Sequence, residues 1–431
     1  MSDALTPAPT PAPTPTPPAP QSPSTSPSSL TPPLPLARNR RFQLLWTGAA
    51  ASVLGARLAD TAFPLLLLAR TGSAALAGAF GAVQLGATVL CGLHGGAVAD
   101  RHDRRRVLLA ADGIRFLATA GVVAAQLLGR LAVAHLLLVA AVVGAATAYG
   151  GPVRPLAVRA VVPPEQLGQA LTQEELRGSG AALLGPPLAG LLFSLGRVVP
   201  VLGTALGSLF SFFATLAVRF DGRPAGHRRQ AGDGNLWAGA RVLLASPLLR
   251  ATLGAALPLN VAGSAMTLAV IVLLRDRGTG STAIGLVLAG EAVGAIAGAF
   301  LVGRLHRLAG PGRLLLAASW LCVPLTVGLL LPGGPVTVFL VLAAMNLAMP
   351  ALRVMIDVLI FRQVPDELRG RVIAVTMTTM LAGVPAGTLA VGLLLDRFSP
   401  ATTLLMLAGA LALGLLPASC SRALRAARWP G

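Results

Sequence analysis

The sequence predicts an all-α polytopic membrane protein with twelve transmembrane helices in two pseudo-symmetric six-helix bundles. Three observations predict this fold class: an apolar composition, the number of long apolar segments, and loop motifs that occur once in each half of the chain. Of the 431 residues, 54% are hydrophobic and only 12% are charged, and the mean hydropathy is +0.74. A water-soluble chain of this size needs much more polar surface, so we expect the protein to lie in a lipid bilayer.

Twelve segments are long enough to cross a hydrocarbon core of about 30 Å, which takes roughly 20 helical residues. The first six predicted spans cover residues 42–68, 73–98, 107–128, 135–158, 171–195 and 199–218. The last six cover residues 251–274, 283–302, 314–331, 336–360, 373–395 and 401–416. The predicted organisation is a disordered Pro/Ser/Thr-rich cytoplasmic tail (1–37), an N-terminal six-helix bundle (38–220), a cytoplasmic linker (221–248), a C-terminal six-helix bundle (249–420) and a basic cytoplasmic tail (421–431).

The arginines indicate how the spans are oriented. The chain has 34 basic residues, all of them Arg, and 16 acidic residues, for a net charge of +18. Most loop arginines fall on the side of the N-terminus, among them Arg104, Arg228 and Arg369. Because cytoplasmic loops carry the excess of basic residues, we expect a multi-pass protein of a bacterial plasma (inner) membrane with both termini in the cytoplasm. Topology accounts for the charge, so the expected partner is the lipid bilayer and not a nucleic acid.

Two loop motifs are repeated between the halves. Residues 96–105 (GAVADRHDRR), between spans two and three, have a weaker copy in residues 303–313 (GRLHRLAGPGR), between spans eight and nine. Residues 162–168 (VPPEQLG), after span four, match residues 364–371 (VPDELRGR), after span ten. Repeats about half a chain apart indicate a duplicated six-helix unit.

The first of these loops resembles the loop signature of the major facilitator superfamily. The residues that carry the resemblance are Gly96, Asp100, Arg101, Arg104 and Arg105. With residues 39–42 (NRRF), 71–73 (TGS) and 364–371, the chain resembles the enterobactin-exporter-like drug and metabolite efflux branch of that family. The resemblance implies the major facilitator fold and a cytoplasmic gate loop that holds the two halves together and favours the outward-facing state.

The sequence departs from the family pattern at three places. Asp103 stands where the general signature prefers Gly, and Arg307 stands where the second copy has the signature Asp. Span four has no good match to the family's Arg motif. We therefore expect the second loop to lack the same latch, and the proton route to be less defined than the fold.

Span five contains a motif that, in this family, is associated with antiporters. Gly185, Pro186 and Gly190 match it, while Ala181 replaces the Gly that would complete it. Gly and Pro thin and bend a helix, which allows close packing and rocking against a neighbour. A plain packing seam of small residues is the alternative interpretation.

Acids inside the spans are candidate proton-coupling groups, because a charge in hydrocarbon is costly unless it is paired, protonated or facing water. Asp60 follows Arg57 by one turn, so the two side chains share a helix face and can pair. Glu291 lies among Ala, Gly and Val with no basic residue within a turn. Arg353 and Asp357 are also spaced to pair, and for all of them the alternative is a structural role.

No catalytic or metal-binding pattern is present in the sequence. The five His share no ligand spacing, and we find neither a nucleophile set nor a phosphate-binding loop. We therefore expect no enzyme activity, no metal and no cofactor, with a proton gradient as the energy source.

The predicted function is proton-coupled export of a small hydrophobic or amphiphilic molecule, such as an antibiotic, a drug or a siderophore-like metabolite, by alternating access. The expected central cavity is lined by spans one, four, five, seven, eight, ten and eleven. An importer of a nutrient or lysophospholipid with the same fold, and a transport-inactive receptor or scaffold, remain the alternatives. The resemblance implies a monomer.

Overall fold

Long apolar helices make up most of the part of the chain that the structure describes. The computed structural model describes residues 35–220, 236–308, 310–354, 356, 364 and 366–426. Within these ranges the regular elements are all helical, and twelve helices there are long and apolar enough to cross a membrane. The predicted fold class is therefore confirmed, while residues 1–34 of the predicted tail lie outside the described ranges.

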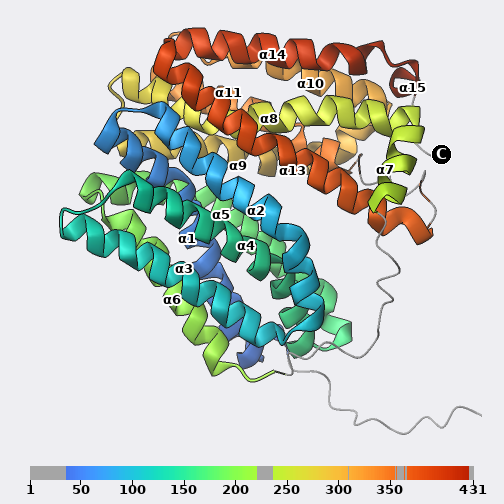
Figure 1. Ribbon diagram of the computed structural model, residues 1–431. Helices are drawn as coiled ribbons and strands as arrows, with labels where there is room; N and C mark the ends of the chain where they lie inside the picture. Colours follow the sequence, from blue (N-terminus) through green and yellow to red (C-terminus); the bar gives the residue numbers. More distant parts are fainter. Residues whose placement is uncertain are drawn as a thin grey trace, which may run out of the picture. The chain divides into compact units, whose positions relative to one another are not determined.

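The first six spans form one group of helices, in the blue-to-green part of Figure 1. They are α1 (Arg40–Thr71), α2 (Ala74–Arg101), α3 (Arg104–Leu127), α4 (Val133–Val161), α5 (Leu167–Leu195) and α6 (Val199–Ala217). Two short 3-10 helices precede α1 and α5, namely η1 (Leu36–Arg38) and η2 (Pro164–Gln166). Each helix lies within a few residues of its predicted span, and α1 and α4 are longer than predicted at both ends.

The last six spans form the second group, in the yellow-to-red part of Figure 1. They are α8 (Pro247–Asp276), α9 (Ser281–Leu308), α10 (Pro311–Gly328), α11 (Gly334–Asn346), α13 (Asp366–Arg397) and α14 (Pro400–Cys420), followed by the short α15 (Arg422–Arg425). The span of α11 continues to Val354 after a turn at residues 347–348. Pro350 explains this break, because it has no N–H to donate to the carbonyl of Asn346 one turn earlier.

The predicted linker contains a helix that the sequence did not indicate. This helix, α7 (Leu236–Ala245), packs against α8 and α13. Its Leu243 is buried in the main hydrophobic core. The end of the predicted linker is therefore part of the packed C-terminal group.

The structure shows which contacts residues 39–42 (NRRF) make within the N-terminal group. Asn39 caps α1 by accepting a hydrogen bond from the backbone N–H of Phe42 at 3.2 Å. Its side-chain amide also donates to the carbonyl of Val161 at 2.9 Å. Phe42 is fully buried in a small core with Val158 and other residues of α4 and α5. The motif thus joins the start of α1 to the end of α4.

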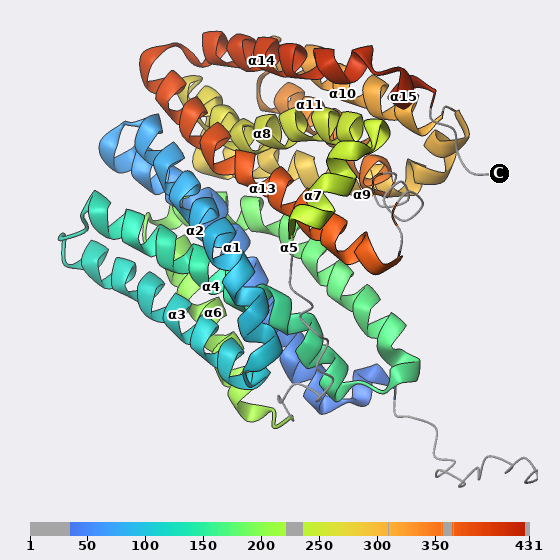
Figure 2. The same ribbon diagram turned by 45° about the vertical axis from the view of Figure 1, so that its right-hand side comes forward.

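The two groups approach each other most closely at one end of the bundle, which we call the closed end. There α2 crosses α13 at Gly78 and Gly392, and α5 crosses α9 at Gly190 and Gly285. A methyl group on Gly190 would come within 2.2 Å of the Ser281 carbonyl oxygen, so only glycine permits this crossing. Figures 1 and 2 both show the groups converging at the α1–α2 connection.

The opposite end, which we call the linker end, carries the connection between α6 and α7. Glycines of α5 nearer this end, Gly168, Gly178 and Gly180, would have no atom within 4 Å of an added methyl group. The described residues therefore show close crossings between the groups at the closed end, and open space beside α5 toward the linker end. This is the arrangement expected of one state in alternating access.

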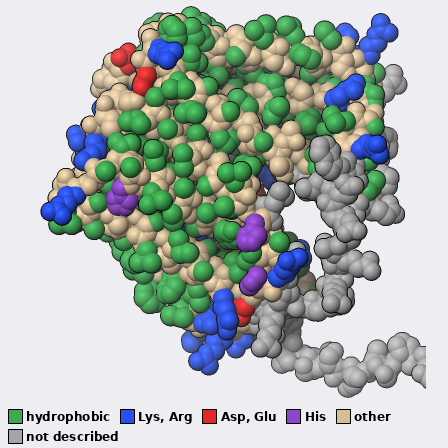
Figure 3. All heavy atoms as spheres, in the orientation of Figure 1, with side chains coloured by type: hydrophobic (Ala, Val, Ile, Leu, Met, Phe, Trp, Pro, Cys, Tyr) green, Lys and Arg blue, Asp and Glu red, His purple; other side chains and the backbone are tan. Residues whose placement is uncertain are grey.

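The flank of the bundle is suited to lipid. Figure 3 shows hydrophobic side chains spread over its middle and basic side chains mostly toward its edges. Large side chains stay exposed there, such as Leu90 at 82% and Phe300 at 84%. Apolar exposure of this kind is unfavourable in water and is satisfied in a bilayer.

Candidate functional site

A first cavity lies between the two groups of helices and has a volume of about 310 Å³. It is lined by residues of α1, α2, α8 and α13: Arg57, Asp60, Pro64, Ala77, Phe80, Gly81, Gln84, Leu85, Ser264, Thr267, Leu268, Ile271, Val384 and Thr388. The predicted lining by spans one, seven and eleven agrees with this. Spans four and five, which were also predicted to line the central cavity, contribute no residue to this one, whereas α2 does.

Arg57 and Asp60 form the predicted pair in this cavity. Their closest side-chain atoms are 3.4 Å apart, and the side chains are 52% and 42% exposed to the cavity. The side-chain amide of Gln84 donates a second hydrogen bond to Asp60 at 3.3 Å. The Asp60 carboxylate therefore has both a charge partner and a neutral donor.

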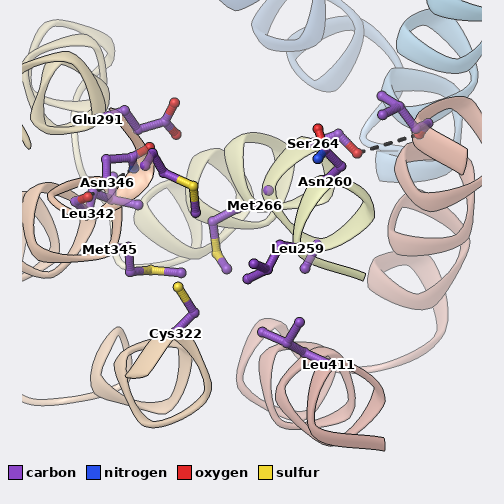
Figure 4. Close-up of a pocket in the computed structure, with 14 residues that line it drawn as sticks. Leu259, Asn260, Ser264, Met266, Glu291, Cys322, Leu342, Met345, Asn346 and Leu411 are labelled. Atoms are coloured by element: carbon purple, nitrogen blue, oxygen red, sulfur yellow. Dashed lines mark hydrogen bonds between the residues drawn. The ribbon is translucent and has the colours of Figure 1, made fainter. Parts of the chain in front are cut away.

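A second cavity, of about 390 Å³, lies within the C-terminal group (Figure 4). Its lining comes from α8, α9, α10, α11 with its continuation, α13 and α14: Leu259, Asn260, Ala262, Gly263, Ser264, Met266, Glu291, Cys322, Leu342, Met345, Asn346, Met349, Val384 and Leu411. Ser264 and Val384 line both cavities, so the two are neighbours. Spans nine and twelve, which were not predicted to line a cavity, contribute Cys322 and Leu411.

Glu291 stands at the junction of the two cavities. Its carboxylate lines the second cavity and accepts a hydrogen bond at 3.4 Å from Thr267, which lines the first. Arg57 interacts with Glu291 electrostatically from across the interface between the groups. Among the described residues, however, no cation forms an ion pair with Glu291.

A buried charge cluster lies inside the N-terminal group, and sequence reasoning missed it. Asp112 on α3 is 2.7 Å from Arg154 on α4 and 3.4 Å from Arg115 on its own helix. Ser211 donates to the second carboxylate oxygen at 2.6 Å, and Ser52 donates to the first at 3.2 Å. The available signal was an Asp and an Arg one turn apart inside an apolar span, and an Arg between Pro152 and Pro155.

The predicted gate loop joins α2 to α3 at the linker end. Asp103 caps α3 by accepting from the backbone N–H groups of Arg105 and Arg106, at 2.8 and 3.4 Å. Asp103 therefore serves as a helix cap at the position where the family signature prefers Gly. Gly96 and Asp100 lie in the last turns of α2, but the Asp100 side chain is outside the part of the chain that the structure describes.

Arg105 connects the gate loop to the end of α6. Its guanidinium donates to the carbonyls of Leu216 at 2.7 Å, Val218 at 3.1 Å and Thr215 at 3.4 Å. These are carbonyls at a helix C-terminus, where a cation is favourable. Arg101 is exposed, and the buried Nε of Arg104 has no hydrogen-bond partner among the described atoms.

The span-five motif, on α5, contacts α1 on one side and α9 on the other. A methyl group on Gly185 would meet the Cβ of Arg57 at 2.4 Å, so the motif packs directly against the helix turn that carries this arginine. Gly190 and the carbonyl of Pro186 face Gly285 on α9, in the other group. The motif therefore lies at a close contact between the halves, which is a geometry common to a packing seam and to a rocking contact.

The last predicted pair, Arg353 and Asp357, is described only in part. Arg353 is exposed on the continuation of α11, while Asp357 lies outside the described residues. Their pairing stays a prediction.

Comparison with known proteins places these features in a family. The family model "Major Facilitator Superfamily" matches residues 45–388. The multidrug efflux pump Tap of Mycobacterium bovis is 28% identical over 387 residues, which cover 86% of this chain and 90% of the relative. The enterobactin exporter EntS of Shigella boydii is 28% identical over 280 residues, or 64% of this chain and 67% of the relative.

A solved structure is similar in fold. The crystal structure of the nucleoside transporter NupG has a TM-score of 0.72 at 14% identity, and the match covers 89% of this chain and 99% of that chain. At this identity the likeness concerns the fold alone. Because the family model extends over most of the chain and the fold agrees with it, this protein belongs to the Major Facilitator Superfamily and is a multi-pass membrane transporter.

Proposed function

We propose that this transporter exports a small hydrophobic or amphiphilic molecule in exchange for protons, and that proton and substrate compete for Glu291. The observation that carries the proposal is the position of Glu291, a carboxylate at the junction of two cavities that has no ion-pair partner among the described residues. Tap and EntS, similar over most of this chain, are an efflux pump and an exporter, which supports the outward direction.

A carboxylate in this position can exchange ligands. An uncompensated charge inside the bilayer costs several kcal/mol, so the group is stable when it is protonated or when a ligand pairs with it. Protonation of Glu291 then weakens substrate binding, and loss of the proton restores it. Because the two events are linked, a proton gradient can drive the substrate in the opposite direction.

Asp60 has a different part in this proposal. Arg57 and Gln84 already balance its charge and satisfy its oxygens. Its protonation would leave Arg57 unpaired beside the cavity. We therefore propose that Asp60 stays ionised and keeps Arg57 in place, while Glu291 exchanges the proton.

Alternating access requires the two ends of the bundle to open in turn. If the termini are cytoplasmic, as the distribution of arginines predicts, then the separated linker end opens to the cytoplasm and the closed end faces outward. Substrate would enter from the cytoplasm, or from the inner leaflet, and leave after the closed end opens. Rocking at the glycine crossings of α2 with α13 and of α5 with α9 would connect the two states.

Export driven by a pH gradient tests the proposal. The full-length protein is reconstituted in liposomes, and transport of a panel of fluorescent amphiphiles is followed after a pH jump. We expect Glu291→Gln to reduce proton-driven transport by about tenfold or more, since it removes the exchangeable charge at nearly constant shape. The matched control is Glu165→Gln, which removes one exposed carboxylate on η2.

The outcomes separate the alternatives. Accumulation against the predicted direction would support an importer, a possibility kept open by the fold shared with a nucleoside transporter. Full proton coupling in Glu291→Gln would refute the role of Glu291. An absence of transport in the wild-type protein for every compound, with unchanged folding, would favour the receptor or scaffold alternative.

A further inference from the structure

The polar side chains of the second cavity offer more hydrogen-bond acceptors than donors. The amide nitrogen of Asn260 donates to the carbonyl of Ala256 at 3.1 Å, and that of Asn346 donates to the carbonyl of Leu342 at 3.0 Å. Rotating either amide by half a turn would place two oxygens in contact, so these orientations are determined by the helix. Among the described residues no donor reaches either side-chain oxygen, and both asparagines line the cavity.

The other polar side chains of this cavity follow the same pattern. The Ser264 hydroxyl donates to the carbonyl of Val261 at 2.8 Å. Glu291 accepts from Thr267 through one oxygen only. No Arg, Lys or His belongs to the described lining, and its one thiol, Cys322, is a weak donor. The described lining therefore presents to a ligand one carboxylate, two amide oxygens and the second N–H of each of these amides, with no cationic side chain.

We propose that this cavity binds a protonated amine carried on an apolar or aromatic body. The proposal rests on the function proposed above and specifies its substrate class. An ammonium group brings both the positive charge that Glu291 lacks and the N–H donors that the oxygens of Asn260 and Asn346 lack. A neutral or anionic head group would leave the carboxylate uncompensated.

The apolar part of the lining suits the body of such a ligand. Met266, Met345 and Cys322 come from three different helices, and Figure 4 shows their sulfur atoms pointing toward a common space. Met349 adds a further thioether to the lining. Thioethers are polarisable, adapt to different shapes and make favourable contacts with aromatic rings. A volume of about 390 Å³ lies in the range of drug-sized sites, about 300–1,000 Å³.

The first cavity is not the site for the ammonium group. Arg57 faces it, and Asp60 is already paired with that arginine. A cation there would meet a guanidinium, whereas in the second cavity it meets an unpaired carboxylate. The charged and titratable groups around Glu291 in the described residues are Cys322 in the same cavity and Arg57 with Asp60 across the interface.

Equilibrium binding of four matched probes tests the proposal. The probes are 3-(2-naphthyl)-N,N-dimethylpropylamine, its trimethylammonium derivative, its neutral analogue with CH in place of N, and the corresponding carboxylate. The purified full-length protein is used in detergent at one pH, without a gradient. We expect the tertiary amine to bind about tenfold or more tightly than the neutral analogue, and about threefold or more tightly than the trimethylammonium probe, which has no N–H.

Variants assign these preferences to residues. Glu291→Gln is expected to remove the preference for the amine over the neutral analogue. The tertiary ammonium has a single N–H, which we expect to donate to one of the two amide oxygens, so one of the variants Asn260→Leu and Asn346→Leu should reduce the preference for the tertiary over the quaternary amine. Glu165→Gln, outside the cavity, should keep both preferences. Equal affinity of the wild-type protein for amine and neutral analogue would overturn the proposal even if no variant folds.

The binding test can fail independently of proton-driven export. Proton-driven export of the neutral or carboxylate probe, without selective binding of the amine, would keep proton-driven export and overturn both this inference and the competition at Glu291. Selective binding of the amine without proton-driven export of any probe would support this inference and refute the proposed function. Amine selectivity that persists in Glu291→Gln would overturn the assignment to this cavity.

Discussion

In the N-terminal helices, the carboxylates of Asp60 and Asp112 each contact a guanidinium, whereas in the C-terminal helices Glu291 has no such partner among the described residues. Both groups are six-helix units of similar length. One contains a buried cluster of charges, whereas in the described part of the other the carboxylate of Glu291 faces a cavity. In the function proposed above, the two halves therefore divide two tasks: charge pairs stabilise the N-terminal group, and the carboxylate of Glu291 exchanges a proton in the C-terminal group.

The buried cluster should therefore be the more important for stability, and Asp112 is its centre. Asp112→Asn would leave Arg115 and Arg154 without a counter-charge inside the bundle. We expect a loss of about 3–5 kcal/mol, as for one partner of a buried ion pair. Thermal unfolding of the purified protein measures it, with Glu291→Gln as the matched carboxyl-to-amide control. Similar melting temperatures for the two variants would contradict the comparison.

The closed end contains a smaller interaction between the two groups, which we call the Asp396 clasp. The carboxylate of Asp396 on α13 accepts from the Ser73 hydroxyl at 2.6 Å and from the backbone N–H of Ala74 at 2.5 Å, at the start of α2. This position satisfies a free N–H group and the positive end of the helix dipole.

Asp396→Asn should destabilise the closed end by about 1–2 kcal/mol, which corresponds to a shift of roughly five- to thirtyfold in the population ratio of the two states. Spin labels at Arg70 and Arg397 would report the change as a longer distance between the groups at that end. Asp276→Asn, at the end of α8, is the control with the same chemical change. An unchanged distance distribution in Asp396→Asn would exclude the clasp as a determinant of the closed state.

The smallest effect is expected at the gate loop. Arg105→Ala removes three hydrogen bonds to the end of α6, whereas Arg101→Ala removes an exposed arginine two residues before the Asp103 cap. We expect a loss of about 1 kcal/mol for Arg105→Ala and almost none for Arg101→Ala. Denaturation midpoints compared side by side would decide, and equal values would show that the loop contact does not stabilise the N-terminal group.

Sequence reasoning succeeded where a property belongs to one helix. About 20 apolar residues in a row define a span whatever it packs against, so the twelve spans were predicted within a few residues. The Arg57–Asp60 pair was predicted for the same reason, since the spacing along one helix brings the side chains together. The position of Glu291 within a span was also visible, although the cavity beside it was not.

The remaining features depend on contacts between distant segments. Ser73 and Asp396 are separated by 323 positions in the chain. In the sequence each is only a polar residue near the end of a span, with nothing to indicate that the two interact. Arg154 can be recognised as an ion-pair partner only once α4 packs beside α3 and brings its side chain to Asp112. Asn260 and Asn346 are uncharged, so a search for ionisable residues in the spans passed over the two acceptors that border the cavity.

Proton release on ligand binding tests the exchange at Glu291 most directly. The naphthyl dimethylamine probe is added to the purified protein in weakly buffered solution, near the pH at which half of the Glu291 carboxyl groups are protonated. A pH indicator then measures the number of protons released. We predict release of up to about half a proton per bound probe in the wild-type protein and in Asp60→Asn, and none in Glu291→Gln. Undiminished release in Glu291→Gln would contradict the account.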